Sequence, residues 1–360
     1  MKSYNYLFEQ FINEDNIRIS IHDAAIGKKR RDTVAEVLND VDGYIPIIKD
    51  YAINFHNVYH KPIEIYDGIQ RKKRVIIVPT FFECIVHHMI INVLKPIFMK
   101  GMYYHTYASI ENRGNHKGKR FIEKWLTEDP ENTQYCLKID IRKFFNSIPH
   151  DILLQRLHNL IHDQRFMSVL EEVINAVPNG LPLGFYTSQW LANWYLQPLD
   201  HYIKEQLHIK YSIRYMDDMV MFAMTSSELH YARNKISDYL NNELGLELKD
   251  NWQVFLMHNI DIYGNEYGRF LDFMGFRFYR NRTTLRKSIM LKSTRKARRI
   301  AKKDHPTIYD ARQMLAYKGW YDHTDTAQLY KDRIAPYVDM NDLQRKVSKY
   351  DKAKAKRSSK

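Results

Sequence analysis

Tyr215-Met216-Asp217-Asp218 lies between two strand-like stretches, residues 211–214 and 219–222, and this arrangement decides the fold. The pattern predicts a β-hairpin with adjacent carboxylates at its tip. Because two unpaired buried carboxylates would cost too much free energy, they need solvent or a cation. Mg²⁺ prefers carboxylate oxygens and is held by one or two of them together with substrate phosphates. The alternative is that the two aspartates only form the turn, where aspartate is common.

A third acidic residue ends a predicted strand upstream, Tyr135-Cys136-Leu137-Lys138-Ile139-Asp140. Alternation places Leu137 and Ile139 on the core face and Lys138 and Asp140 on the opposite face. From there, Asp140 could meet the Asp217-Asp218 hairpin across a sheet. Three carboxylates around two magnesium ions are what nucleotidyl transfer requires.

With these elements in place, the chain resembles a reverse transcriptase from about Arg71 to beyond Arg280. Five motifs occur in the order of that family. They are Asp140 as the first metal aspartate, Phe145 as the aromatic steric gate, residues 179–189 as the loop and helix beside the templating base pair, residues 215–218 as the metal hairpin, and residues 271–276 as the primer grip.

The resemblance implies an α+β, right-hand polymerase fold, with fingers, a palm containing an antiparallel sheet, and a helical thumb. We expect an N-terminal helical segment over 1–60, fingers over 61–134, the palm over 135–280, a basic helical thumb over 281–350 and a disordered basic tail over 351–360. Helices are expected from Phe81 to about Lys95, closed or kinked by Pro96, from Ser188 as the cap, and from Ser227 to Leu244.

The resemblance also implies the site residues. Two Mg²⁺ ions, for which Mn²⁺ could substitute, would be bound by the catalytic residues Asp140, Asp217 and Asp218. Nucleotide binding is expected from Lys72, Arg74, Ile141, Phe145, Leu183, Gly184 and Gln189. The primer grip is expected at Phe273, Met274, Gly275 and Phe276. Lys249 lies near the place of a lysine that protonates pyrophosphate in many polymerases, but its register differs and it is left outside the catalytic set.

One departure from the usual motif of reverse transcriptases narrows the resemblance to a part of that family. Most reverse transcriptases have Pro-Gln-Gly and then Ser-Pro in this loop, whereas this chain has Pro182-Leu183-Gly184 and Ser188-Gln189. The pattern is similar to that of diversity-generating retroelements, whose enzymes copy a template RNA with frequent errors at adenines. Leu183 offers shape without a hydrogen bond, and shape rejects mismatches weakly. Some phage-defence reverse transcriptases have related palms, so a defence role remains the alternative within the same chemistry.

Composition fits a polymerase of nucleic acids. The chain has 360 residues and a formal net charge of +13. Residues 281–360 contain 22 Lys and Arg against 8 Asp and no Glu, so the positive excess lies in the expected thumb. A basic element of this kind can clamp a phosphate backbone. A second basic cluster, residues 28–31, could contact RNA or simply precede a helix.

The chain has two cysteines, Cys84 and Cys136, and no Cys-x-x-Cys pair, which predicts neither structural zinc nor a disulfide framework and favours a reducing cytoplasm. The resemblance to retroelement enzymes implies a prokaryotic or phage-encoded protein. The most apolar stretch, Val75 to Leu94, contains Glu83, His87 and His88, so no membrane span is expected. The expected partners are template RNA, the cDNA or primer, dNTPs and, by resemblance alone, a small basic accessory protein. A catalytically idle RNA-binding scaffold is the alternative from another class.

Overall fold

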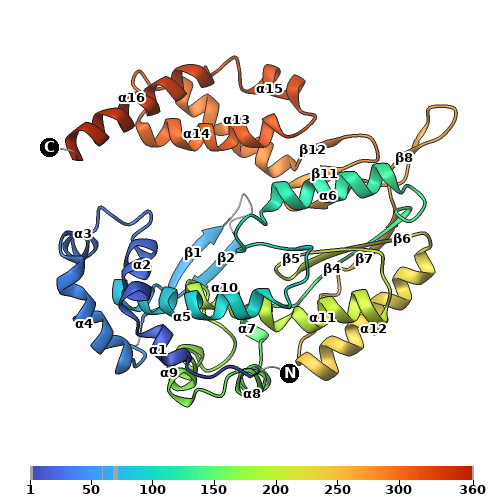
Figure 1. Cartoon of the computed structure of the whole chain (residues 1–360). Coiled ribbons are helices and arrows are strands. Elements are labelled where there is room, and N and C mark those ends of the chain that lie inside the picture. The colour runs from blue at the N-terminus through green and yellow to red at the C-terminus, as the bar shows by residue number, and fades with distance from the viewer. Residues whose placement is uncertain (1–2, 59, 68–71, 359–360) are drawn as a thin grey trace. The chain divides into compact units, whose positions relative to one another are not determined.

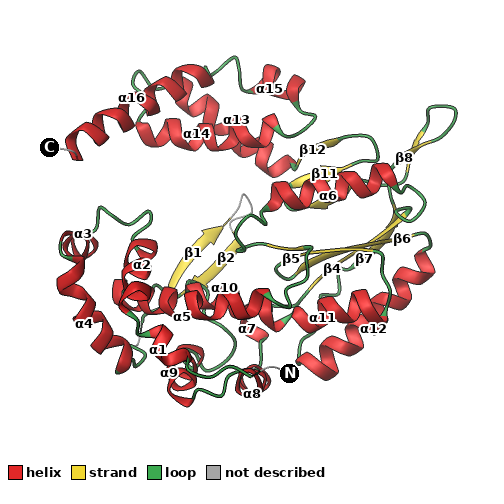
Figure 2. Cartoon of the chain, viewed as in Figure 1, coloured by secondary structure: helices red, strands yellow, loops and turns green. Residues whose placement is uncertain are grey.

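The computed structural model describes residues 3–58, 60–67 and 72–358, and the side chains of 67, 72 and 354–358 stay outside that description. Helices and strands are both plentiful, so the fold has the mixed helix and strand content that the sequence predicts (Figure 2). The chain divides into two compact units. The first contains Met1–Arg113, Leu137–Phe222 and Ser227–Val254, and the second contains Gly114–Cys136, Ala223–Ser226 and Phe255–Lys360.

A five-stranded sheet lies mostly in the first unit (Figure 1). Its strands follow the order β3-β5-β6-β4-β7, with bounds β3 Thr106–Tyr107, β4 Tyr135–Asp140, β5 Tyr211–Tyr215, β6 Asp218–Ala223 and β7 Gln253–Leu256. The strands β5 and β6 pair antiparallel, with Tyr215 opposite Asp218. The strand β3 pairs parallel with β5, so the sheet is mixed and the prediction of an antiparallel sheet was wrong at this edge.

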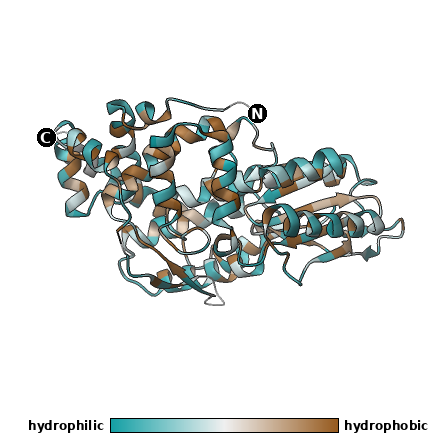
Figure 3. Ribbon diagram, turned by 90° about the horizontal axis from the view of Figure 1, so that it is seen from below, coloured by the Kyte–Doolittle hydropathy of each residue, from teal (hydrophilic) through white to brown (hydrophobic). Residues whose placement is uncertain are grey.

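Most of the remaining elements of the first unit are helices, and Figure 3 shows that helices of the chain carry both hydrophobic (brown) and hydrophilic (teal) residues. In the first unit their bounds are α1 Leu7–Phe11, α2 Glu14–Ala24, α3 Asp32–Asn39, α4 Val41–Ile53, α5 Phe81–Met99, α7 Phe144–Ser147, α8 His150–Leu160, α9 Gln164–Ile174, α10 Tyr186–Tyr195, α11 Gln197–His201, which a short π-helix at Tyr202–Gln206 follows directly, and α12 Ser226–Leu244.

The helix α5 begins at a capping box, in which Thr80 and Glu83 each bond the backbone N–H of the other. It runs through Pro96 to Met99 and so extends beyond the predicted end. By length and composition α5 could cross a bilayer, but 56% of its apolar window is buried inside the protein. A core helix passes the same test, so this is weak evidence for a membrane span.

Two other helix boundaries test the sequence patterns. The helix α12 ends at Leu244, where Gly245 adopts a φ of 58°, as predicted. The helix α10 begins two residues before Ser188, so Ser188 is not its cap. The Ser188 hydroxyl instead donates to the carbonyl of Pro182 at 2.8 Å, inside the protein.

A two-stranded hairpin, β1 Ile63–Asp67 and β2 Lys72–Ile76, precedes α5. Its register places Ile65 opposite Arg74 and Tyr66 opposite Lys73. The Lys73 ammonium lies 2.6 Å from the Glu64 carboxylate. Since neighbouring residues of a strand point to opposite faces, Arg74 lies on the face that Lys73 does not occupy.

The second unit contains α6 Asn115–Glu128, a hairpin of β8 Asn259–Ile260 and β9 Glu266–Tyr267, the sheet β10 Leu271–Phe273, β11 Phe276–Phe278 and β12 Thr283–Leu285, and the helices α13 Lys287–Ala301, α14 Ile308–Asp322, α15 Ala327–Arg333 and α16 Met340–Ser358. The buried carboxylate of Asp310 joins α13 to α14, because Lys296 and Lys303 donate to it at 2.8 and 2.7 Å.

These units divide the chain differently from the predicted domains. Residues 114–134, expected in the fingers, and residues 255–280, expected in the palm, both belong to the second unit. The expected disordered tail begins at residue 351, whereas α16 continues to Ser358; residues 359–360 lie outside the described residues. Its Lys- and Ala-rich sequence has high helix propensity, which accounts for the extra turns.

Candidate active site

The turn between β5 and β6 carries the first of the predicted metal ligands. Tyr215 and Asp218 close the hairpin, so Met216 and Asp217 are its two central residues. Met216 adopts a φ of 58°, a conformation that disfavours residues with a side chain. The turn therefore stores strain, and it projects Asp217 from the end of the hairpin.

Asp140 ends β4, which neighbours β6 in the sheet. Its backbone carbonyl accepts a hydrogen bond from the Lys249 N–H at 2.8 Å, and its Oδ2 accepts a second one from the Lys249 ammonium. Both side chains are about one-third exposed, at 30% for Asp140 and 32% for Lys249. The other carboxylate oxygen of Asp140, Oδ1, is buried and has no hydrogen-bond partner.

Asp140 and Asp217 lie close enough to influence each other. Burial raises the pKa of Asp217 to about 6, and the charge of Asp140 and a side-chain hydrogen bond with it act in the same direction, while Lys249 lowers it. A carboxyl group held near a second carboxylate resists ionisation unless a cation is bound. The pair is therefore a place where a divalent cation would stabilise the charged forms.

Asp218 faces a different cation, since its Oδ1 lies 3.9 Å from the Lys138 ammonium. Among the described residues, no group of three or more His, Cys, Asp or Glu side chains is arranged to hold a metal ion. The prediction that Asp218 joins Asp140 and Asp217 as a third metal ligand therefore stays a prediction. The Asp140–Asp217 pair, with the unpartnered Oδ1 of Asp140, fits Mg²⁺ held by two carboxylates and completed by substrate phosphates.

The predicted loop beside the templating base pair is fixed by two glycines. Gly180 has a φ of 71°, and a Cβ there would meet the Phe145 carbonyl at 2.3 Å. Gly184 has a φ of 115°, and a Cβ there would meet the Ile77 carbonyl at 2.0 Å. Leu183 accepts a hydrogen bond at its carbonyl from the Ile77 N–H at 2.8 Å. The loop therefore requires glycine at both positions. Its backbone packs against Phe145, which follows Asp140 in the sequence, and against Ile77, which follows β2.

The remaining predicted nucleotide-binding residues differ in accessibility. Ile141 is buried and pairs with Leu248, so its side chain belongs to the core. Phe145 is half-buried, and its ring centroid lies 5.5 Å from that of the buried Phe144. Leu183 is half-buried. Gln189, Gly184 and Arg74 are exposed, whereas the side chain of Lys72 lies outside the described residues.

The predicted primer grip forms a hairpin turn in the second unit. Met274 and Gly275 occupy the turn between β10 and β11, with φ values of 50° and 90°. The rings of Phe273 and Phe276 are fully buried in that unit. A Cβ at Gly275 would meet the ring of Trp320 at 2.8 Å, which explains the glycine. Any contact with a primer would therefore come from the turn and not from the two phenylalanines.

Three cations near the site, Lys249, Lys138 and Arg214, were not among the predicted site residues. Lys249 was noticed but excluded, and only the folded chain places it on Asp140. Lys138 could have been found, because alternation already places it on the face of Asp140. Arg214 is buried at 1% exposure and bonds the Met216 carbonyl. A charged residue inside a strand of otherwise apolar character was the available signal.

Comparison with known families identifies one that matches most of the chain. The family described as "Reverse transcriptase (RNA-dependent DNA polymerase)" matches residues 60–278. This stretch contains the strand β4, the loop at residues 180–184 and the β5–β6 hairpin.

Individual relatives match shorter stretches. Protein YkfC of Escherichia coli (strain K12) is 25% identical over 146 residues, which are 38% of this chain and 38% of that protein. The 91 kDa protein in the cob intron of Schizosaccharomyces pombe is 40% identical over 75 residues, which are 18% of this chain and 9% of that protein. This chain therefore spans less than two-fifths of these relatives. Among solved structures, apo telomerase from Candida tropicalis aligns with a TM-score of 0.49 at 12% identity, covering 74% of this chain and 55% of that one.

Proposed function

This chain belongs to the reverse transcriptase family, and we propose that it copies an RNA template into DNA by two-metal nucleotidyl transfer. The observation that carries the proposal is the pairing of Asp140, at the end of β4, with Asp217, at the tip of the β5–β6 hairpin. Two carboxylates from distant parts of the sequence converge there, one at the end of a strand and the other in a strained turn. Such a pair gives Mg²⁺ or Mn²⁺ protein ligands and leaves room for phosphate oxygens.

Each residue near this pair has a proposed role. Asp140 and Asp217 would hold the divalent cations, and Asp218 would contribute more weakly from the base of the turn. Two bound cations would supply an activated 3′-hydroxyl and a stabilised pyrophosphate leaving group. Lys249 neutralises Asp140 and keeps a positive charge beside the carboxylate pair. Deprotonation of Asp217 is needed before it can act as a ligand.

The nucleotide would be recognised by residues around the same pair. Arg74 and Lys72 of β2 would bind the triphosphate, for which the guanidinium fork of Arg74 is well suited. Phe145 would lie under the incoming ribose, and its ring would exclude a 2′-hydroxyl. Leu183, Gly184, Ile141 and Gln189 would shape the pocket for the nascent base pair. The turn at residues 273–276 would support the primer, as in the family resemblance.

The subtype we propose is an error-prone enzyme of a diversity-generating retroelement. Its support is the loop Pro182-Leu183-Gly184, in which an apolar side chain replaces the usual amide. Template RNA and a small basic accessory protein would be its partners. In this proposal the helices α13 to α16 act as a basic thumb, and the β1–β2 hairpin belongs to the fingers. A defence-associated reverse transcriptase is the alternative.

Primer extension tests the function directly. The purified chain is given an annealed RNA template and DNA primer with dNTPs and Mg²⁺, and Asp217→Asn is the matched control. Extension by the wild type and none by the variant is expected. A wild type that extends no primer with either Mg²⁺ or Mn²⁺ would reject the activity and favour the idle scaffold. Errors concentrated opposite adenine favour diversification, and uniform accuracy favours the defence alternative.

A further inference from the structure

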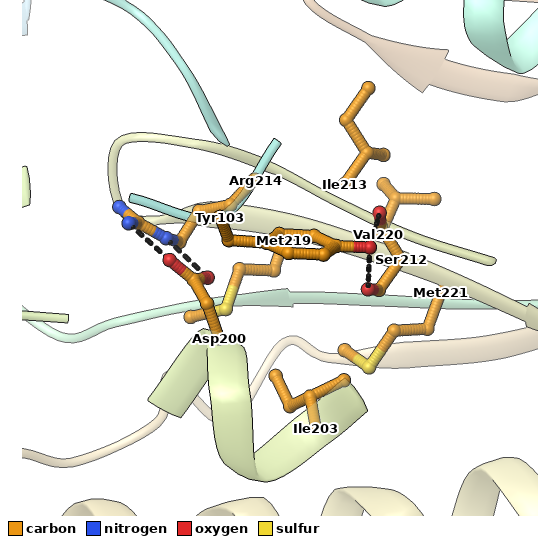
Figure 4. A pocket seen from close by; sticks show the side chains of 9 residues that line it. All are labelled: Tyr103, Asp200, Ile203, Ser212, Ile213, Arg214, Met219, Val220 and Met221. Atoms are coloured by element: carbon orange, nitrogen blue, oxygen red, sulfur yellow. Dashed lines mark hydrogen bonds and ion pairs between the residues drawn. The ribbon is translucent and has the colours of Figure 1, made fainter. Parts of the chain in front are cut away.

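Arg214 is a buried charged residue near the C-terminal end of β5, one residue before Tyr215. Only 1% of its surface is exposed, and 3% of that of Asp200. The guanidinium binds the Asp200 carboxylate through two hydrogen bonds, from Nε to Oδ1 at 2.7 Å and from Nη2 to Oδ2 at 2.6 Å (Figure 4). Thr106 of β3 donates to the same carboxylate at 3.1 Å. The pair is thus fully hydrogen-bonded within the protein.

The same guanidinium reaches the turn that carries Asp217. Its Nη1 donates to the Met216 carbonyl at 3.1 Å and to the Asn193 side-chain oxygen at 3.1 Å. Its Nη2 donates to the Asn193 carbonyl at 3.2 Å. One side chain therefore connects β5, the helix α10 and the central residue of the metal-binding turn.

Met216 needs such a restraint. A non-glycine residue at a φ of 58° costs free energy, on the order of 1 kcal/mol, and persists only when its surroundings hold it. Within the described part of the chain, its backbone is held by the Arg214 bond to its carbonyl and by a longer bond from its N–H to the Tyr107 carbonyl, at 3.4 Å. Of these the charged donor at 3.1 Å is the stronger.

The helix α10 carries this restraint to the predicted templating loop. Ser188 of α10 donates to the Pro182 carbonyl, and Asn193 lies further along the same helix. Asn193 also donates to the Ala108 carbonyl at 3.1 Å, which fixes its amide and hence the oxygen that Arg214 bonds. The loop before α10 and the turn after β5 are therefore attached to one rigid helix.

We propose that Arg214 is a positioning residue for metal binding: it fixes the strained Met216 turn, and with it the Asp217 carboxylate, against α10. Stability alone does not explain the pair, because replacing a buried ion pair with apolar side chains is often neutral or stabilising. A lysine could not reproduce the planar fork that serves Asp200, Asn193 and Met216 together. The inference rests on the proposed function, since it assumes that Asp217 binds a cation.

Two variants of the full chain test it. Arg214→Lys keeps the positive charge and loses the planar guanidinium group that bonds Asp200, Asn193 and Met216 at once. The double variant Asp200→Asn with Arg214→Met removes both charges, so neither is left buried without its partner if the single variant fails to fold. Arg156→Lys is the matched control, because Arg156 also donates to a backbone carbonyl, that of Tyr195 at 2.8 Å, but does not touch the hairpin.

Amide hydrogen exchange over residues 214–218 and Mn²⁺ binding by calorimetry are the two measurements. We expect exchange at the turn to accelerate in both Arg214 variants, while global stability in the double variant stays near that of the wild type. Mn²⁺ should bind about 10-fold to 100-fold more weakly, as when other supports of metal ligands are removed. Arg156→Lys should change neither quantity.

Folded Arg214 variants with wild-type exchange at the turn and wild-type Mn²⁺ affinity would overturn the proposal. The proposed function can fail separately: if Asp217→Asn binds Mn²⁺ as the wild type does, the metal assignment is wrong. In that case the exchange rates still decide whether Arg214 holds the turn.

Discussion

Lys249 bonds Asp140 twice, with its backbone N–H donating to the Asp140 carbonyl at 2.8 Å and its ammonium donating to the carboxylate. The first contact fixes the segment after Gly245 against the end of β4. The second places a positive charge on one member of the carboxylate pair. A cation that binds Asp140 must therefore compete with this ammonium, or displace it.

The competition gives a first prediction. Lys249→Met removes the competing charge, so Mn²⁺ should bind roughly tenfold more tightly, a change that the interaction of two charges near a protein surface can supply. Calorimetric titration of the metal measures it. Lys138→Met is the matched control and should have a smaller effect, because the Lys138 ammonium lies 3.9 Å from Asp218. Weaker Mn²⁺ binding by Lys249→Met would contradict the competition.

Asp217→Asn supplies the second prediction, which concerns both activity and pH. Primer extension should vanish while the fold persists, because the substitution removes charge and keeps shape. Without metal, the raised pKa of Asp217, about 6, means that the folded state binds more protons than the unfolded state between about pH 4 and pH 6. Wild-type stability should therefore fall as pH rises through this window.

Asparagine cannot ionise, so the stability of Asp217→Asn should not fall as pH rises through this window. At pH 8 without metal, Asp217→Asn should be more stable than the wild type by roughly 3 kcal/mol, and near pH 4 the two should be equal. Thermal denaturation at the two pH values measures the difference. Adding Mg²⁺ should stabilise only the wild type, since only the folded wild type binds it. Equal stabilities of the wild type and Asp217→Asn at pH 8 would show that ionising Asp217 in the folded state costs no free energy, which would contradict the prediction.

Local patterns in the sequence were sufficient for the elements that carry the site. Alternation predicted β4 with its bounds, and the Tyr215–Asp218 turn lies where the two strand-like stretches place it. Gly245 ended α12 as its position predicted. In each case the information lies within a few neighbouring residues, which is where periodicity and turn chemistry act.

Contacts between distant segments were beyond such patterns. The bond between Lys249 and Asp140 joins residues 109 positions apart and depends on the order of strands in the sheet. The same limit applies to Arg214, whose partners Asp200 and Asn193 lie on helices that had to be packed against β5 first. The place of α6 in the second unit likewise follows from tertiary contacts, which neither composition nor period encodes.

Sugar selection gives the third prediction. Phe145→Ala should admit ribonucleotides, because removal of the ring makes room for a 2′-hydroxyl. Extension with each rNTP, compared with the matching dNTP, measures the selectivity. Phe144→Leu is the matched control: Phe144 is buried at 2% exposure, so its change should lower stability and leave sugar selection intact. A folded, active Phe145→Ala that still rejects rNTPs would make Phe145 a core residue.

The last prediction concerns Leu183, whose carbonyl bonds the Ile77 N–H at 2.8 Å and whose side chain is half-buried. This backbone bond does not depend on the side chain, so Leu183→Gln should keep the loop and add an amide near the nascent base pair. A site that can hydrogen-bond discriminates more strongly than one that offers only shape. Misincorporation opposite adenine should therefore fall more than misincorporation opposite the other three bases, with little change in correct incorporation.

Single-nucleotide extension on RNA templates that differ at one base measures this change in misincorporation. The control Leu183→Met, which keeps an apolar side chain, should retain the wild-type errors. If Leu183→Gln and Leu183→Met share one error pattern, the infidelity does not originate at this residue.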